Sequence, residues 1–296
     1  MRILFIGSSY SSKILLKQCF KLKLNIVGVC TLKKSFNHDF CDLIKHFKNK
    51  KVPKIYCNDI NSMKIRNWIY KRKPDLIFCF GWSQLLPKKI YSIPQFATIG
   101  FHPTALPMNR GRHPIIWSLV LGLKKTASSF FVINNQNPDD GFVISQKKIS
   151  ISKNDNSNSL YKKILRVAVL QLPIIMNFFL KKKRLGFKKS TRSNIWRKRD
   201  YNDGKIDWRM SARNIYNLFR ALEYPYMNSH FNFKNKEYKI LKCKILNPKD
   251  NKKNNFLEPG KILKKTKLFF DVKCGEGVLR ILRLNKKINI KEINYL

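Results

Sequence analysis

The 296-residue sequence predicts an α/β domain with a mostly parallel sheet, followed by a small barrel-like domain of β-strands. In the first half, short and nearly continuous apolar runs alternate with helical patterns, which is typical of a parallel sheet buried on both faces. After residue 205 the β runs are short and closely spaced, which is typical of a small barrel. Hydrophobic residues make up 44% of the chain, so both domains have enough apolar side chains for a core.

The first half supplies the elements of the parallel sheet in order. Strands are expected at residues 3–7, 25–30, 53–57, 75–80 and 97–101, and helices at residues 11–22, 42–47, 63–70 and 114–121. Two further β runs, 128–133 and 142–149, flank a stretch rich in Asn, Asp, Pro and Gly, which predicts a loop at 134–141. Ser157 or Asn158 is a suitable N-cap for a long helix that ends before Lys181.

The second half begins after a basic, poorly periodic stretch at residues 181–199. A turn at Asp203 and Gly204, a short strand at 205–208 and a helix at 211–222 are expected next. The β runs that follow are 230–233, 238–246, 260–263, 268–272 and 278–284, with a turn at 275–277. We therefore predict a first domain at 1–185, a linker at 186–204 and a second domain at 205–296.

The charge of the chain is strongly positive, with 61 Lys and Arg against 17 Asp and Glu and a formal net charge of +44. Such a surface favours polyanionic partners such as tRNA or nucleotide-linked sugars. Lys, Asn and Ile also saturate stretches that carry no motif, so compositional drift explains the charge equally well. The charge alone therefore does not select a partner.

The cysteines and the apolar runs indicate the compartment. The seven cysteines are scattered and include no CxxC pair, which predicts free thiols and no structural metal site. The longest apolar run, at 167–176, falls short of the roughly 18 residues of a membrane span. Met1 leads directly into a predicted buried strand rather than into a signal segment. A cytoplasmic protein without a membrane span is expected.

The residues that indicate chemistry are His102, at the end of a predicted strand, and Asp139, in the predicted loop. Ligands bind outside the carboxyl ends of parallel strands, so the position of His102 fits a site. Attack of an amine on a carbonyl carbon requires a group that accepts and returns a proton near neutral pH, and histidine is the common choice. A nearby carboxylate orients the imidazole. His102 and Asp139 are the predicted catalytic residues.

Four ordered blocks resemble the folate-dependent formyltransferases, which use 10-formyltetrahydrofolate as co-substrate. The catalytic half carries FGWSQLLP at 80–87, HPTALP at 102–107, RGRHPIIW at 110–117 and DDG at 139–141. DGKIDW at 203–208, RAL at 220–222 and PGKIL at 259–263 are similar to the family's small carboxyl-terminal barrel. The resemblance implies a Rossmann-like catalytic domain, an OB-like second domain and transfer of a formyl group to an amine.

The resemblance also implies roles for single residues. His102 and Asp139 match the histidine and aspartate of the family triad, whereas Gly100 takes the place of the asparagine that polarises the formyl oxygen. A second oxyanion donor must then be another backbone N–H, Asn109 or a water. Asp140 is expected only to form the turn, and Arg110 to lie in a solvated basic loop. The residues expected to bind the folate are Leu85, Leu86, Thr104, Leu106, Pro107, Arg112, Asn135 and Asp139.

The acceptor of the formyl group stays open between two branches of the family. The blocks around Gly100 and Arg110, and the approach to the barrel at 196–200, look more like the branch that formylates nucleotide-linked amino sugars. The net charge favours the other branch, which formylates methionyl-tRNA. A folate- or RNA-binding protein whose catalysis has lapsed at Gly100 and a hydrolase of formylfolate are further alternatives. We expect the amino sugar to be the acceptor.

Overall fold

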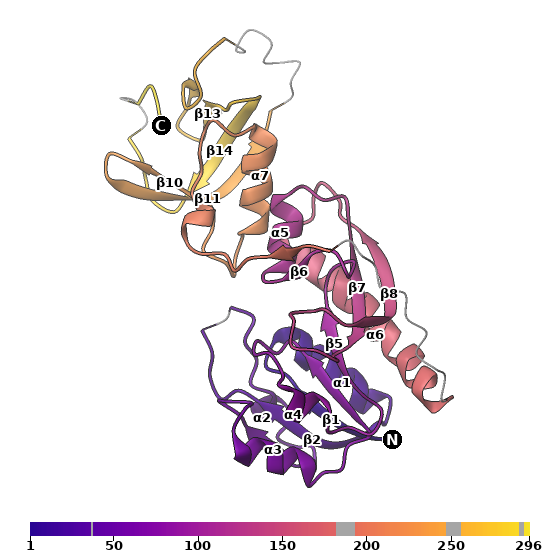
Figure 1. Ribbon diagram of the computed structural model, residues 1–296. Helices are drawn as coiled ribbons and strands as arrows, with labels where there is room; N and C mark the ends of the chain where they lie inside the picture. Colours follow the sequence, from indigo (N-terminus) through magenta and orange to yellow (C-terminus); the bar gives the residue numbers. More distant parts are fainter. Residues whose placement is uncertain (37, 182–192, 247–255, 290–292) are drawn as a thin grey trace. The chain divides into compact units, whose positions relative to one another are not determined.

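The computed structural model describes residues 1–36, 38–181, 193–246, 256–289 and 293–296. The chain packs as two compact units, which are described separately (Figure 1). Unit 1 comprises residues 1–114, 125–150 and 161–197, and unit 2 comprises residues 115–124, 151–160 and 198–296. The domain limits expected from the sequence stay a prediction, and residues 186–192 of the expected linker lie outside the described part of the chain.

Unit 1 is built on a seven-stranded sheet in the order β3-β2-β1-β4-β5-β7-β8. The strands β3, β2, β1, β4 and β5 pair in parallel, β7 pairs antiparallel with β5, and β8 pairs antiparallel with β7. The predicted mostly parallel sheet is therefore confirmed. The strands are β1 (Arg2–Ile6), β2 (Asn25–Thr31), β3 (Lys54–Tyr56), β4 (Leu76–Phe80), β5 (Ala97–His102), β7 (Lys125–Val132) and β8 (Phe142–Ser150).

Helices cover both faces of this sheet, because successive side chains of the central strands point in opposite directions. Ile3 and Phe5 of β1 pack with α1 (Tyr10–Lys21) and the apolar side of α6 (Ser157–Leu180). Leu4 and Ile6 pack with α3 (Met63–Tyr70) and α4 (Lys88–Tyr91). The apolar runs of the sequence are continuous because both faces are buried. The short helix α2 (Leu43–His46) completes this part of the chain.

The helix α6 is 24 residues long and apolar enough, by length and composition alone, to cross a membrane. It is longer than the apolar run at 167–176, since flanking residues extend the helix. Ala168, Leu172, Ile175, Met176 and Phe179 are buried against the sheet of unit 1. Packing in the core thus accounts for the apolar residues on one side of α6, whereas Leu170, Ile174 and Leu180 are exposed.

Unit 2 contains a five-stranded antiparallel sheet in the order β10-β11-β14-β13-β12. The helix α7 (Ala212–Ala221) contacts β11 and β14 of this sheet (Figure 1). Its residues Ile215, Leu218 and Phe219 are buried, as the helical spacing predicted. The expected barrel-like domain is confirmed as an antiparallel half-barrel. Its strands are β10 (His230–Phe233), β11 (Lys236–Ile245), β12 (Ile262–Lys265), β13 (Phe270–Lys273) and β14 (Val278–Leu284).

The prediction of a strand at 205–208 is wrong. Only Lys205 forms a bridge, to His230, and it follows the short 3-10 helix Asn202–Gly204. The backbone turns at Asp207 instead, because its carboxylate accepts hydrogen bonds from the backbone and side chain of Arg209. An aspartate that binds the backbone two residues later is typical of a turn. The remaining strands of this unit lie close to their expected positions.

The stability of unit 2 at acidic pH should depend on a buried histidine. His230 is buried and its ring stacks on Tyr201, with ring centroids 4.3 Å apart. Burial lowers the pKa of His230, and the charges of Lys239 and Lys205 act in the same direction. The unfolded chain therefore binds a proton at this residue more readily than the folded one, so the fold loses stability as the pH falls below about 6.5.

We expect the His230→Gln variant to lose less stability than the wild-type chain on acidification from about pH 7.5 to about pH 5.5. Urea unfolding followed by circular dichroism at several pH values measures this. His46→Gln, which changes an exposed histidine of α2, is the control and should follow the wild-type slope. Equal slopes for wild type and His230→Gln would contradict the prediction.

Candidate active site

The strand β5 ends at His102, and the structure brings the two predicted catalytic residues together there. The His102 Nδ1 atom lies 3.4 Å from Asp139 Oδ2. The other ring nitrogen, Nε2, donates to the backbone carbonyl of Asn109 at 2.9 Å. The ring thus lies between a carboxylate and a carbonyl oxygen. The neutral ring donates to one of these acceptors, and the protonated ring donates to both.

Asp139 reaches the ring from the loop between β7 and β8. Its Oδ2 atom also accepts a hydrogen bond from the backbone N–H of Gly111 at 3.0 Å. Asp139 has a φ of 51°, in the left-handed region that aspartate tolerates better than most residues. The side chain of Asp139 is 22% exposed and that of His102 is 6% exposed. A substrate therefore reaches the carboxylate more readily than the ring.

The loop after His102 is fixed by its own polar side chains. The Thr104 hydroxyl donates toward the carbonyl oxygens of Met108 and Asn109, both at 3.1 Å. The Leu106–Pro107 peptide bond is cis, and the Leu106 carbonyl accepts a hydrogen bond from Gln146 of β8. These contacts place the Asn109 carbonyl opposite the imidazole.

Arg110 is buried, which corrects the expectation that it lies in a solvated loop. Its Nη1 atom lies 2.6 Å from Asp140 Oδ1, in an ion pair whose side chains are 10% and 29% exposed. Asp140 is therefore more than a turn former. The pair ties the loop after β5 to the loop that carries Asp139. Arginine and carboxylate compensate each other at such a partly buried position.

The place next to Gly100 is filled by an aromatic ring. Gly100 and Phe131 are directly paired residues of β5 and β7, so the Phe131 side chain lies over Gly100 on the face of the sheet that carries His102. A Cβ atom added at Gly100 would lie 2.5 Å from Phe131 Cζ. A Cβ atom added at Gly141 would lie 2.7 Å from Phe131 Cδ2. The Phe131 ring thus occupies the space that an asparagine side chain at position 100 would need.

The residues predicted to bind the folate differ widely in exposure. Leu86 packs in the core with α3 and α4, and Thr104 and Leu106 are also buried. These three are placed to offer backbone groups rather than side chains. Leu85 is 57% exposed, and Arg112 donates from Nη1 to the carbonyl of Ser83 at 3.3 Å. Asn135 donates to the Asp140 carbonyl and so fixes the loop of Asp139.

Sequence reasoning missed the segment that supports the loop. Ile195 and Trp196 form β9, which pairs in parallel with β6 (Arg110–Gly111). The side chain of Asn194 accepts a hydrogen bond from the backbone N–H of Asn109 at 2.8 Å. The two paired segments are too short to give a period-2 pattern, so the sequence carried little signal for them. The role of Phe131 was missed for a different reason, since its pairing with Gly100 depends on strand register.

The Cys79 thiol is not activated as a nucleophile, and no metal-binding cluster lies in the described part of the chain. The seven cysteines are free and buried, and burial raises the pKa of the Cys79 thiol, with the charge of Asp139 acting in the same direction. A reactive thiolate is therefore not favoured there. Within the described ranges, no group of three or more His, Cys, Asp or Glu side chains is placed to hold a metal ion.

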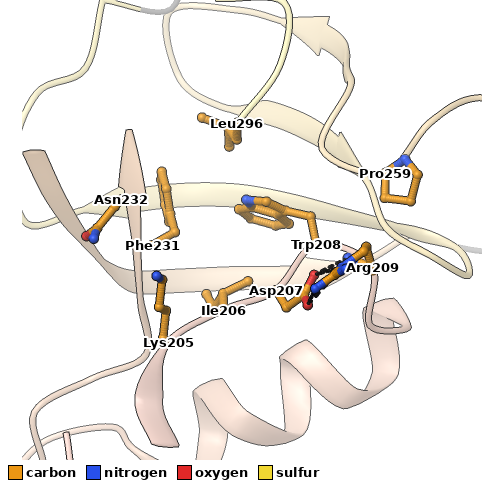
Figure 2. A pocket seen from close by; sticks show the side chains of 9 residues that line it. All are labelled: Lys205, Ile206, Asp207, Trp208, Arg209, Phe231, Asn232, Pro259 and Leu296. Carbon is orange, nitrogen blue, oxygen red and sulfur yellow. Dashed lines mark hydrogen bonds and ion pairs between the residues drawn. The ribbon is translucent and has the colours of Figure 1, made fainter. Parts of the chain in front are cut away.

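A separate hollow of about 520 Å³ lies in unit 2 (Figure 2). Trp208 and Phe231 lie in it with ring centroids 5.5 Å apart, and both are buried. Asp207 and Arg209 form an exposed ion pair beside them, and hydrogen bonds from Arg209 lower the pKa of Asp207 to about 2. The hollow contains none of the predicted site residues. It is lined by Lys205, Ile206, Asp207, Trp208, Arg209, Phe231, Asn232, Pro259 and Leu296.

Two family models match the chain in the order of its two halves. The model described as formyl transferase matches residues 1–174, and the model described as formyl transferase, C-terminal domain, matches residues 198–294. Together with the sheet, the half-barrel and the paired imidazole and carboxylate, this match defines a folate-dependent formyltransferase. The chain belongs to the formyl transferase family. Formyl-tetrahydrofolate is the co-substrate used in this family.

The relatives carry two kinds of name. The bifunctional polymyxin resistance protein ArnA of Wigglesworthia glossinidia brevipalpis is 33% identical over 264 residues, which cover 86% of this chain and 39% of the relative. The methionyl-tRNA formyltransferase of Thermodesulfovibrio yellowstonii is 35% identical over 228 residues, which cover 75% of this chain and 70% of the relative. The chain thus spans well under half the length of the first relative and about two thirds of the second.

Solved structures agree on the fold. WlaRD, a sugar 3N-formyl transferase, matches with a TM-score of 0.69 at 18% identity over 97% of this chain and 99% of its own. A methionyl-tRNA formyltransferase from Clostridium thermocellum matches with a TM-score of 0.58 at 16% identity over 83% of this chain and 94% of its own. At these identities the likeness concerns the fold alone, and the acceptor is left open.

Proposed function

We propose that this protein transfers the formyl group of 10-formyltetrahydrofolate to the amino group of a nucleotide-linked amino sugar. The observation that carries formyl transfer is the 3.4 Å contact between His102 and Asp139 at the end of β5. Both residues lie within the span that the formyl transferase model matches. The choice of an amino sugar is supported by the sequence blocks around Gly100 and Arg110.

The reaction requires one proton to move from the attacking amine to the leaving nitrogen of the folate. The amine nitrogen forms a bond to the formyl carbon, a tetrahedral centre with an oxyanion results, and the bond from the formyl carbon to N10 then breaks. We propose that the pair of His102 and Asp139 accepts the amine proton and returns it to N10. The carboxylate is the more exposed member of the pair, and the Asn109 carbonyl holds the ring from its other side. Such a pair contributes about 10²- to 10⁴-fold to the rate.

The oxyanion has fewer side-chain donors here than the family pattern provides, because Gly100 and Phe131 leave no room for an amide at position 100. The backbone N–H of Asn109 is already bound to Asn194, so it is not available as the substitute donor. Both ring nitrogens of His102 also face other partners, so the remaining donors are the Asn109 carboxamide, other backbone N–H groups and water. A hydrogen bond to a developing oxyanion lowers the barrier only if the donor is already in place.

A second candidate acceptor, methionyl-tRNA, is favoured by the charge of unit 2. The strand β11 exposes Lys236, Lys242 and Lys244 to solvent. Lysines that contact phosphates release counterions, so binding of tRNA weakens steeply as salt rises. An amino-sugar nucleotide carries few phosphates and gives a much shallower dependence. The salt dependence therefore separates the two acceptors.

The test incubates the purified chain with 10-formyltetrahydrofolate and follows the release of tetrahydrofolate with each acceptor in turn. We expect release with an amino-sugar nucleotide, and a fall of less than about tenfold in rate when salt rises from about 50 to about 200 mM. Transfer to methionyl-tRNA that falls by about 10³-fold or more over this range would replace the proposed acceptor. Folate binding with no release in the presence of either acceptor would indicate lapsed catalysis, and release with water alone would indicate hydrolysis. We further propose that the protein acts in the cytoplasm.

A further inference from the structure

We infer that Asn194 is a positioning residue for His102, and that it acts through the backbone of Asn109. This inference rests on the proposed function, in which the His102 ring takes part in proton transfer. Asn194 lies 85 positions beyond Asn109 in the sequence, just before β9. None of the blocks by which the chain resembles its family contains it.

The contact runs through one residue. The Asn194 Oδ1 atom accepts a hydrogen bond from the backbone N–H of Asn109 at 2.8 Å. The carbonyl of the same Asn109 accepts from His102 Nε2 at 2.9 Å. A carbonyl oxygen only accepts, so this bond fixes the nitrogen of His102 that carries a proton. Movement of Asn109 would therefore release the ring from its orientation toward Asp139.

The backbone of Asn109 is held in its conformation by an external partner. Its φ is 63°, in the left-handed region, which asparagine adopts more readily than most residues. Asn194 supplies two acceptors to consecutive N–H groups, since its backbone carbonyl accepts from Arg110 at 3.1 Å. The side chain and the backbone carbonyl of Asn194 thus both bind the start of β6.

The same short strand also holds the second member of the pair. The Gly111 N–H donates to Asp139 Oδ2 at 3.0 Å, and the Arg112 N–H donates to the carbonyl of Trp196 at 3.0 Å. A Cβ atom at Gly111 would lie 2.4 Å from the Trp196 carbonyl, so only glycine permits this approach of β9. The segment from Asn109 to Gly111 therefore contacts His102 with its carbonyl and Asp139 with its N–H. The Asn194 side chain binds this segment through the backbone N–H of Asn109.

The activity test compares four variants of the full chain. We expect Asn194→Ala to lower kcat about 10- to 100-fold, because a displacement of about 1 Å in a catalytic group has an effect of that size. The Km for the folate should change much less, since Asn194 acts on the ring rather than on binding. Asn194→Asp keeps an oxygen at the same place and should recover most of the kcat. Asn194→Gln carries the amide one methylene further and should resemble Asn194→Ala, and Ser193→Ala, an exposed neighbour, should match wild type.

A second measurement does not depend on turnover. Nitrogen-15 spectra of the histidine side chains report the hydrogen bond at His102 Nε2, and loss of a signal in His102→Ala assigns it. We expect this signal to shift in Asn194→Ala and Asn194→Gln and to keep its position in Asn194→Asp and Ser193→Ala. If the wild-type chain transfers no formyl group, the proposed function fails, and the spectra still decide the role of Asn194.

Two outcomes overturn the inference. An unchanged His102 signal together with wild-type kcat in Asn194→Ala would show that the ring is held without Asn194. Failure of both Asn194→Ala and Asn194→Gln to fold would show that Asn194 holds the unit together as a whole rather than the ring. A lowered kcat with a shifted signal, restored in Asn194→Asp, supports it.

Discussion

Replacement of His102 by alanine should lower the rate of formyl transfer by about 1,000-fold. The variant loses both contacts of the ring, the 3.4 Å contact with Asp139 and the hydrogen bond to the Asn109 carbonyl. Without the ring, the amine proton has no acceptor next to the carboxylate. The measurement is the release of tetrahydrofolate under saturating folate, with the acceptor identified in the wild-type assay.

The matched variants separate chemistry from folding. Asp139→Asn keeps the shape of the side chain and removes its charge, so it should lower kcat by about 100-fold or more while the variant stays folded. His46→Ala removes an exposed histidine of α2 and should leave the rate unchanged. Near wild-type transfer by His102→Ala would remove the proposed proton pathway, whereas loss of transfer in His46→Ala would show that the assay reports stability.

Restoration of the family asparagine by Gly100→Asn should fail, and this is the second large effect that we expect. The added Cβ atom alone would lie 2.5 Å from the Phe131 ring, which Gly141 also approaches closely. Overpacking of a buried site costs about 1–3 kcal/mol. We expect the free energy of unfolding of Gly100→Asn to fall by about 3 kcal/mol. Turnover should fall rather than rise, because the Phe131 ring also lies against Gly141, two residues after Asp139. Urea unfolding and the formyl transfer assay measure the two effects.

The ring of Phe131 offers the control for this prediction. In a Phe131→Ala background the amide has room, so adding Gly100→Asn should raise turnover about tenfold or more by supplying an oxyanion donor. The two substitutions should also couple by about 1 kcal/mol or more in stability, since they share one space. Gly100→Ala should be destabilised almost as much as Gly100→Asn, because the clash begins at Cβ. Wild-type stability of Gly100→Asn would show that the Phe131 ring yields and would refute this account.

The fold class and the two candidate catalytic residues could be predicted from the amino-acid sequence. The continuous apolar runs of β1 and β4 predicted a sheet buried on both faces, because Ile3 and Leu4 both require an apolar neighbour on opposite sides. His102 was found because a polar imidazole directly follows such a run. The prediction of a strand at 205–208 was wrong, because a hydrogen bond from Arg209 to Asp207 turns the chain. Hydrophobic periodicity does not indicate such a local hydrogen bond.

The partners that these residues contact could not be predicted, because they depend on how distant segments pack. The register of β5 and β7 set Phe131 against Gly100, and no pattern within either strand specifies that register to the nearest residue. The burial of Arg110 depends on Asp140, which comes from another loop. The bond from Asn109 to Asn194 joins residues 85 positions apart, and its formation depends on the pairing of two-residue strands. Residue types and local patterns can be read from the sequence. Contacts between distant segments depend on how the packed sheet brings those segments together.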